Sequence, residues 1–424
     1  MKFRSTRSHD ESVSFKKAVF QGLASDGGLF VPEQFPMLSK EQLLSLQHAS
    51  IDEIGSTILS LFIDDIPPTE LQRIIAEGLS FPLPIQTVQK RRILELFHGP
   101  TMAFKDVASR LLPGIMEYYL KKSNRKTLIL TATSGDTGGA VAHGFSEKDN
   151  ITVVILFPKG RVSRIQREQL TYVGNNVYPI EVEGTFDDCQ YFVKLAFLDP
   201  DLTKYNLTSA NSINIGRLLP QMIYYAYTWA TLKENHLIFV VPSGNMGNIT
   251  AGLYAKMIGI PIAKLVIACN TNDPVVKYFE TGIYNKQPAH QTISTAMDIG
   301  HPSNFERIED GINKDFHRFK EIFSAVRVTD EETKQTIQHV YKKHNYLLDP
   351  HTAVAWTAAD TLRLESPVII STAAPIKFAA EIQNETNIIV PDRKRPRDTH
   401  FQRVFSSNNS YAEIKHTMET VISQ

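Results

Sequence analysis

The sequence predicts an α/β protein built on parallel strands, and three observations favour this class. Short apolar runs alternate with helical segments after residue 84, polar glycine turns follow several of these runs, and 424 residues suffice for two or three structural units. The runs lie at residues 93–97, 127–132, 151–157, 237–241, 264–269 and 367–371. Parallel sheets of this kind bind ligands beyond the carboxyl ends of their strands.

The first part of the chain has a different pattern. Residues 11–23 and 40–62 show amphipathic helical periodicity, and they are separated by a glycine turn at residues 26–28 and by a loop that contains prolines. This part contains no obvious chemistry. We therefore expect a mainly helical N-terminal extension over residues 1–82.

Composition excludes several classes of function. The 45 Lys and Arg residues balance 45 Asp and Glu residues, so net charge gives no reason to expect a nucleic acid or a membrane surface as partner. A small-molecule substrate is the default. Cys189 and Cys269 form no disulfide framework, and His98, His143 and His351 lack zinc spacing, so no metal is expected. The polar N-terminus and the lack of a long apolar run favour a cytoplasmic protein.

Lys105 is the main candidate for chemistry. In the run FHGPTMAFKD at residues 97–106, a Gly-Pro turn follows an apolar strand and delivers an amine to the start of a helix. The positive end of a helix disfavours an ammonium, which is one way to prepare a neutral lysine that can form a Schiff base. Taken alone, the run would still favour an ordinary surface lysine.

Two glycine loops could bind anions. One follows residues 127–132 and offers backbone N–H groups and hydroxyls to a carboxylate or phosphate; it contains Ser134, Gly135, Asp136 and Thr137. The other follows residues 237–241 and suits a small phosphorylated cofactor better than a dinucleotide; it contains Gly244, Asn245, Met246, Gly247 and Asn248. Judged alone, either loop fits a capped or tight turn about equally well.

Other polar groups follow further strands. Lys159 comes after residues 151–157, and Arg217 ends the run 212–217; either side chain could contact a phosphorylated substrate, although a surface role is the commoner one. Thr372 ends the strand at residues 367–371. A hydroxyl at that point suits an unprotonated pyridine nitrogen, and the alternative is a plain strand-end turn.

Taken together, these segments resemble the threonine synthases, which are pyridoxal-phosphate enzymes of the tryptophan synthase β-chain fold type. The resemblance covers nearly the whole chain. The N-terminal stretch is similar to the extension found in the subgroup of enteric bacteria and yeast. It is carried in order by residues 5–7, 22–32, 97–106, 132–138, 211–214, 242–248, 270–273, 296–299, 303–307 and 348–353.

The resemblance implies a domain organisation. Two parallel-sheet α/β domains would enclose a pyridoxal-phosphate cleft, behind the mainly helical extension. Residues 83–98 and 211–390 would form a large cofactor-binding domain, and residues 99–210 a small domain that carries Lys105 and the loop at 134–137. Residues 391–424 would be a C-terminal segment.

The resemblance also implies roles for individual residues. Lys105 would hold pyridoxal 5'-phosphate, residues 244–248 would bind its phosphate, and Thr372 would face its pyridine nitrogen. The loop at 134–137 would receive the substrate's α-carboxylate. The candidates for binding the phosphate of the substrate O-phospho-L-homoserine are Lys159, Asn214 and Arg217.

The implied reaction converts O-phospho-L-homoserine and water to L-threonine and phosphate, the last step of threonine biosynthesis, in a monomer or homodimer. Two alternatives stay open: another lyase of the same fold type that adds no water, and a non-catalytic binder of the cofactor or of amino acids. The chain departs from the family pattern at Ser8, Ile215 and Ala374, where glycine, an aromatic residue and histidine are common. Because Ala374 adjoins Thr372, this last departure concerns the cofactor's surroundings.

Overall fold

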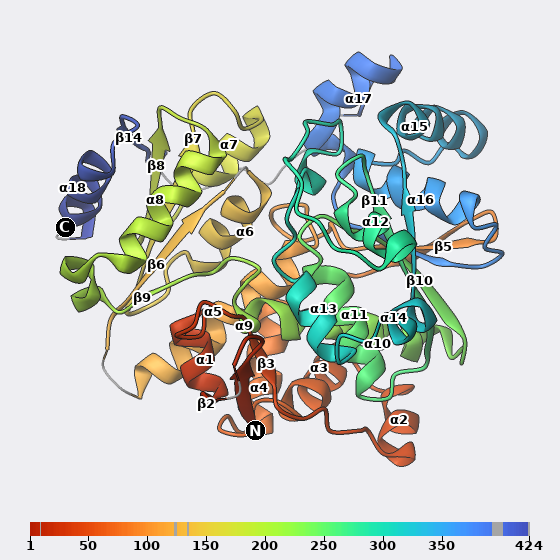
Figure 1. Cartoon of the computed structure of the whole chain (residues 1–424), viewed down its shortest axis with the longest axis horizontal. Helices are drawn as coiled ribbons and strands as arrows, with labels where there is room; N and C mark the ends of the chain where they lie inside the picture. The colour runs from red at the N-terminus through yellow and green to blue at the C-terminus, as the bar shows by residue number, and fades with distance from the viewer. Residues whose placement is uncertain (9, 123–124, 134, 392–401, 423–424) are drawn as a thin grey trace.

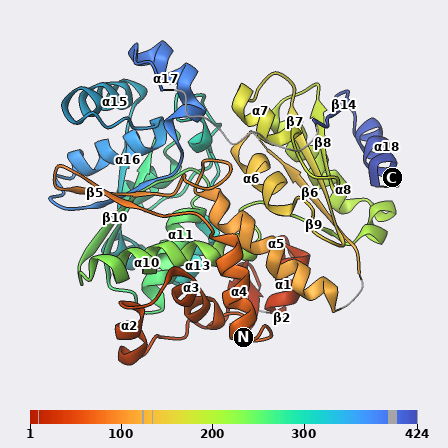
Figure 2. The same ribbon diagram turned by 180° about the vertical axis from the view of Figure 1, so that it is seen from behind.

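Two α/β units lie side by side, and the N-terminal elements lie beneath them (Figures 1 and 2). A computed structural model describes residues 1–8, 10–122, 125–133, 135–391 and 402–422. One unit is built on a six-stranded sheet and the other on a five-stranded sheet. The predicted α/β class with two parallel-sheet units is confirmed.

The larger sheet brings three loops to one edge. Its strand order is β12 (Phe323–Arg327), β11 (Ile262–Cys269), β10 (Leu237–Pro242), β13 (Val368–Ser371), β5 (Arg91–Glu95) and β4 (Ile85–Val88). All neighbours are parallel except β4, which pairs antiparallel with β5. The loops that follow β10, β13 and β5 therefore leave the sheet as neighbours.

Helices complete this unit around the sheet. The helices cover the sheet, and its apolar strands are buried, as expected for a parallel sheet. The helices are α10 (Met222–Leu232), α11 (Gly247–Met257), α12 (Pro274–Thr281), α13 (Phe305–Gly311), α14 (Phe316–Ile322), α15 (Asp330–His344), α16 (Pro350–Thr361) and α17 (Ala379–Thr386), with short 3-10 turns that include η4 (Pro375–Phe378).

The smaller sheet is parallel throughout. Its order is β14 (Phe405–Ser407), β8 (Val177–Val182), β7 (Ile151–Pro158), β6 (Thr127–Ala132) and β9 (Leu207–Thr208). Its helices are α6 (Asp136–Phe145), α7 (Arg164–Thr171) and α8 (Phe186–Leu198). The C-terminal helix α18 (Tyr411–Ile422) buries Ile414, Met418 and Val421 in the same core, so the chain's end belongs to this unit (Figure 1).

The N-terminal extension contains a small sheet that the sequence did not predict. Helices predominate, namely α1 (Phe15–Gln21), α2 (Lys40–Leu46), α3 (Ile51–Ser60) and α4 (Pro68–Gly78). The strands β1 (Lys2–Ser5), β2 (Ser12–Ser14) and β3 (Phe30–Pro32) pair antiparallel and are too short to show periodicity. Ser14 caps α1, so the helix expected from residue 11 begins at Phe15.

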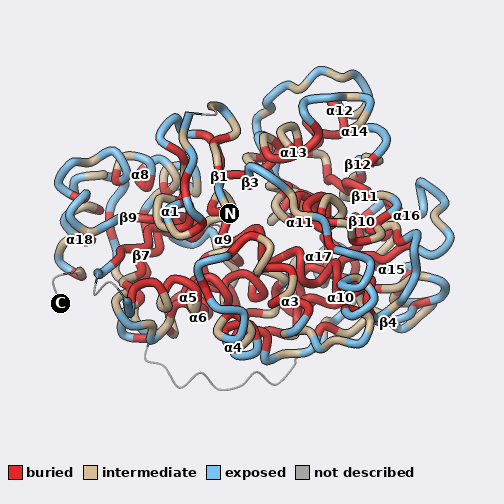
Figure 3. Tube along the Cα trace, turned by 90° about the horizontal axis from the view of Figure 1, so that it is seen from below, coloured by how far each residue is buried: buried red, intermediate tan, exposed pale blue. Residues whose placement is uncertain are grey.

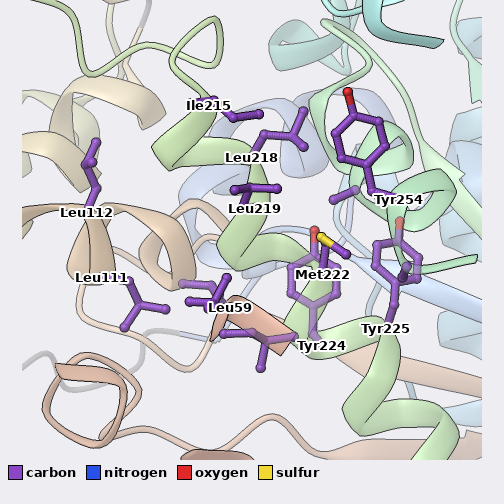
Figure 4. Packing of buried hydrophobic residues seen from close by; sticks show 14 of the residues in the cluster. Leu59, Leu111, Leu112, Ile215, Leu218, Leu219, Met222, Tyr224, Tyr225 and Tyr254 are labelled. Atoms are coloured by element: carbon purple, nitrogen blue, oxygen red, sulfur yellow. The ribbon is translucent and has the colours of Figure 1, made fainter. Parts of the chain in front are cut away.

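The helix that begins at Lys105 lies in a continuous core. This helix, α5 (Lys105–Lys121), packs against α4, α6 and α9 (Ile215–Leu218). Leu111 and Leu112 of α5 belong to one buried cluster with Leu59 of α3 and with residues of α9 and α10, and Figure 4 shows Leu111 beside Leu59. Figure 3 shows that α5, α10 and α3 are largely buried. Burial of α5 on several sides fixes its first turn.

Arg307 ties the extension to the larger unit. Its side chain is fully buried on α13. Its guanidinium donates to the carbonyls of Phe30 at 3.1 Å and Ile213 at 2.7 Å, and to Asn304 Oδ1 at 2.7 Å. Burial lowers the pKa of Arg307 to about 10. Within the described residues, no helix is both long and apolar enough to cross a membrane.

Replacing this arginine tests how firmly the extension is attached. Arg307→Met should lower the free energy of unfolding by about 3 kcal/mol, because buried carbonyls lose a charged donor. Chemical denaturation measures the change. Arg164→Met is the matched control, since that side chain is 85% exposed and pairs with Glu168 at 3.2 Å. Equal destabilisation by both substitutions would contradict the proposed attachment.

Candidate active site

The turn before Lys105 is held by a buried carboxylate. Asp106 accepts a hydrogen bond from the Thr101 N–H at 2.9 Å and another from Thr101 Oγ1 at 2.6 Å. A Cβ at Gly99 would lie 2.4 Å from Asp106 Oδ2, so glycine leaves room for this carboxylate. The Gly-Pro-Thr turn is thereby closed onto the first turn of α5, which begins at Lys105.

Backbone hydrogen bonds attach the lysine loop to the end of β13. The Phe104 N–H donates to the Thr372 carbonyl at 2.8 Å, and the Ala374 N–H donates to the Met102 carbonyl at 3.1 Å. Ala103 and Ala373 form an antiparallel bridge between these bonds. Lys105 therefore begins its helix next to Thr372, although the two residues lie far apart in the sequence.

Ala374 lies in an apolar contact. It is buried in a small cluster with Phe97, Ile165 and Ile376. Ala374 therefore takes part in the packing of the turn after β13.

The loop between β10 and α11 has the geometry of a phosphate site. Met246 adopts the left-handed conformation at φ 61° and immediately precedes the helix. A Cβ at Gly244 would lie 2.9 Å from the Ala296 carbonyl oxygen, which leaves no space for a side chain. The helix starts at Gly247, so its first N–H groups precede the helical hydrogen-bond ladder and are available to an anion.

The amide side chains of this loop fix its shape. Asn245 donates to Ser212 Oγ at 2.6 Å and accepts from the Ser303 N–H at 2.6 Å. Asn248 Oδ1 accepts from the hydroxyls of Tyr224 at 2.8 Å and Tyr225 at 2.7 Å. Asn248 Nδ2 is a buried donor with no hydrogen-bond partner among the described residues.

The glycine loop of the smaller unit leads into α6, which begins at Asp136. Gly135 has φ 138°, and a Cβ there would lie 2.4 Å from the Gln166 side chain. Thr133 Oγ1 accepts from the N–H groups of Gly135 at 2.9 Å and Gly138 at 2.8 Å. Asp136 and Thr137 then start α6. Ser134 lies outside the described residues.

The amine of Lys105 on α5 lies close to the carboxylate of Asp136 on α6, because these two helices pack against each other. Lys105 Nζ lies 3.9 Å from Asp136 Oδ2, and the Lys105 side chain is only 18% exposed. Burial lowers the pKa of Lys105; Asp136 acts in the opposite direction, while the positive charges of Lys377 and Arg217 add to the decrease. The site thus favours a neutral amine, as a Schiff-base lysine requires.

Asp136 has a closer partner that sequence reasoning missed. Lys377 Nζ lies 2.7 Å from Asp136 Oδ1, and Gln166 Nε2 donates to the same oxygen at 3.0 Å. Burial would raise the pKa of Asp136, but the charges of Lys377 and Lys105 outweigh burial and hold that pKa well below its ordinary value. Asp136 is therefore a buried carboxylate anion.

The three candidates for the substrate phosphate have different surroundings. Arg217 is buried, donates to the Ala210 carbonyl at 2.8 Å, and has an Nε with no partner among the described residues. Burial lowers the pKa of Arg217 to about 10, opposed by the charge of Asp106. Asn214 caps α9 and donates to the Val19 carbonyl at 2.9 Å. Lys159 is 52% exposed and pairs with Glu183 at 2.8 Å.

These residues fit a phosphorylated aldehyde with a ring nitrogen. The loops after the neighbouring strands β5, β10 and β13 carry a partly buried amine of lowered pKa, a helix N-terminus with an unsatisfied Asn248 donor among the described residues, and Thr372. Among the described residues, no group of three or more His, Cys, Asp or Glu side chains could hold a metal ion. The fold and this arrangement define a pyridoxal-phosphate-dependent enzyme.

Comparison with known proteins specifies the family. A family described as "Pyridoxal-phosphate dependent enzyme" matches residues 93–371, and one described as "Threonine synthase N terminus" matches residues 2–81. A threonine synthase of Buchnera aphidicola is 40% identical over 93% of this chain and 94% of its own length. The chain belongs to the threonine synthases, so its cofactor is pyridoxal phosphate.

Solved structures agree over the whole chain. The pyridoxal-phosphate-bound threonine synthase of Brucella melitensis has a TM-score of 0.93 at 35% identity and covers 99% of both chains. The threonine synthase of Escherichia coli has a TM-score of 0.91 at 36% identity and covers 99% of this chain and 100% of its own. The extension and both sheets therefore belong to one shared architecture.

Two site residues had weak sequence signals. Lys377 lies in the turn after the strand predicted at residues 367–371, beyond Thr372 and Pro375, and this position is its signal in the sequence. Gln166 forms a capping box with Ser163 at the start of α7. The Ser-x-x-Gln pattern in the sequence therefore indicates only where a helix starts. Its contact with Asp136 depends on how α6 and α7 pack.

A substitution in the phosphate loop tests its close packing. Gly244→Ala should weaken pyridoxal-phosphate binding about tenfold or more, because the new methyl group displaces the loop from the backbone at Ala296. Absorbance titration of the apoenzyme measures the affinity. Gly160→Ala is the control for backbone strain alone, because Gly160 has φ 68° but no atom lies within 4 Å of a Cβ placed there. Unchanged affinity in Gly244→Ala would contradict the assignment of this loop.

Proposed function

We propose that this enzyme converts O-phospho-L-homoserine and water to L-threonine and phosphate, with Lys105 as the cofactor-holding and proton-carrying residue. The observation that carries the proposal is the Lys105 amine, partly buried and 3.9 Å from Asp136, on a helix that begins next to Thr372 in a chain of the threonine synthase family. We further propose a cytoplasmic enzyme that acts as a monomer or homodimer, with no nucleic-acid or membrane partner.

The larger unit would hold the cofactor. Residues 244–248 would bind its phosphate through backbone N–H groups at the start of α11, and the Thr372 hydroxyl would face its pyridine nitrogen. Pyridoxal phosphate supplies an electron sink that stabilises negative charge at the substrate's α and β carbons. A hydroxyl opposite the ring nitrogen leaves that nitrogen unprotonated.

The smaller unit would hold the substrate. The loop at residues 134–137, with its N–H groups at the start of α6, would receive the α-carboxylate. Arg217 is the strongest of our candidates for the substrate phosphate, because it is buried and its Nε is unpaired within the described residues. Asn214 and Lys159 remain weaker candidates, because their polar atoms already have partners.

Lys105 would move the protons of the reaction. Released from the cofactor by the incoming substrate amine, its neutral amine would remove the α proton and then a β proton. Phosphate leaves from the γ carbon, the γ carbon is reprotonated, and water adds at the β carbon. Burial supports this role, because it lowers the pKa of Lys105 and so makes the base form more available near neutral pH.

A product assay tests the reaction. Incubation of the holoenzyme with O-phospho-L-homoserine should release L-threonine and inorganic phosphate in equal amounts. Phosphate released without threonine would instead indicate a lyase that adds no water. Lys105→Ala should remove the visible absorbance of bound cofactor and lower turnover by about 10³-fold or more.

Lys148→Ala is the matched control for this substitution. Lys148 is a partly buried lysine of the same unit, and it pairs with Glu117 at 3.2 Å. We expect it to keep the absorbance and the turnover. Turnover retained in Lys105→Ala would refute the chemistry assigned to Lys105.

The two cationic candidates for the substrate phosphate can be separated by kinetics. Arg217→Gln should raise the KM for O-phospho-L-homoserine about tenfold, because a buried charged donor is lost. Lys159→Gln should change it less than about twofold, because that side chain is exposed and already paired. Steady-state kinetics, with thermal unfolding as a check on folding, decide between them. A larger effect for Lys159 would reverse the assignment.

A further inference from the structure

Lys377 is a second buried lysine for which the proposed reaction has no use. It lies in η4, directly after β13, and its side chain is 0% exposed. A buried ammonium is costly unless charged or polar partners compensate for the water it loses. Its contacts therefore show what holds it there.

The ammonium of Lys377 joins three segments of the site. It pairs with Asp136 at 2.7 Å and donates to the Thr101 carbonyl at 2.8 Å. Asp136 begins α6 of the smaller unit, whereas Thr101 belongs to the turn before Lys105. Gln169 Nε2 also donates to the Thr101 carbonyl, at 3.1 Å. One buried charge thus connects the lysine loop, the substrate loop and the strand end at Thr372.

The two lysines are unequal partners of Asp136. Lys377 lies within hydrogen-bond distance of the carboxylate, and Lys105 lies 3.9 Å away, beyond that distance. Gln166 occupies a further position on the oxygen that Lys377 contacts. The carboxylate is therefore bound away from Lys105, whose amine makes no hydrogen bond with it.

We propose that Lys377 is a positioning residue of the active site: its ammonium holds the carboxylate of Asp136 and keeps it out of hydrogen-bond distance of the Lys105 amine. This inference rests on the proposed role of Lys105. Without Lys377, Asp136 would be left as a buried anion whose nearest cation is Lys105. The reactive amine would then be held as an ammonium by a close ion pair.

The sign of the effect follows from the charges that face Lys105. These are Asp136 on α6, Lys377 on η4 and Arg217 on α9. Asp106 lies on α5, as Lys105 does, and its carboxylate accepts hydrogen bonds from Thr101. Removing Lys377 takes away a positive charge and frees a negative one. Both changes favour the protonated nitrogen of Lys105, so its pKa should rise.

The test uses the holoenzyme and its pH dependence. In Lys377→Met, the acid limb of the pH profile of kcat/KM should move to higher pH by about one unit, and so should any pH midpoint of the visible cofactor band. At pH values below the new midpoint, kcat/KM should therefore be about tenfold lower than in the wild type. Lys377→Arg keeps the charge and should stay close to the wild type. A crystal structure of Lys377→Met should place the Lys105 nitrogen within hydrogen-bond reach of Asp136. A folded Lys377→Met enzyme with wild-type profiles would overturn the proposal.

A second variant gives the opposite sign and applies even if Lys377→Met fails to fold. Asp136→Asn leaves Lys377 charged and uncompensated near Lys105, so the same acid limb should move to lower pH. An unchanged limb in Asp136→Asn would also overturn the proposal. Lys148→Met, which removes a lysine paired with Glu117, should move neither profile.

The proposed function can fail separately. If Lys105→Ala retains the visible band, the role of Lys105 is wrong and this inference falls with it. If Lys105→Ala loses the band while Lys377→Met keeps the wild-type profiles, only the role of Lys377 is wrong.

Discussion

The site depends on the parallel pairing of β10, β13 and β5. Ile370 of β13 lies opposite Leu94 of β5, and Val240 of β10 lies opposite Ile369 of β13. This pairing makes a phosphate loop, a hydroxyl and a lysine turn emerge as neighbours at one sheet edge. Without it, the three motifs would be separate turns with no common ligand. Their convergence is a property of strand order, which local sequence does not encode.

Electrostatics then give the lysine its chemistry. A neutral amine is favoured by burial and by nearby positive charge, whereas a carboxylate at 3.9 Å acts against it. The fold reconciles these effects by giving Asp136 a closer cation. The carboxylate stays ionised and fixed in place, and it remains 3.9 Å from the reactive amine, outside hydrogen-bond distance.

The sequence predicted the secondary structure best where apolar runs are uninterrupted. β6 was predicted at its observed bounds, and β7, β10 and β11 within two residues of theirs. β8 was missed because Pro179 and Glu181 interrupt its apolar pattern; Glu181 is accommodated by Arg167 at 3.1 Å. The strands of the extension were missed because they are only three or four residues long.

The sequence by itself determined the α/β class, the lysine turn and the glycine loops, because each depends on neighbouring residues and their local conformational preferences. Gly99 and Asp106 belong to one turn, and Gly244 and Met246 to another. Only the tertiary structure decided that Lys377 holds Asp136, that Asn214 donates to the Val19 carbonyl, and that Lys159 points to solvent beside Glu183. These outcomes depend on packing between segments far apart in the chain, where a buried charge must find whichever partner the fold brings within reach.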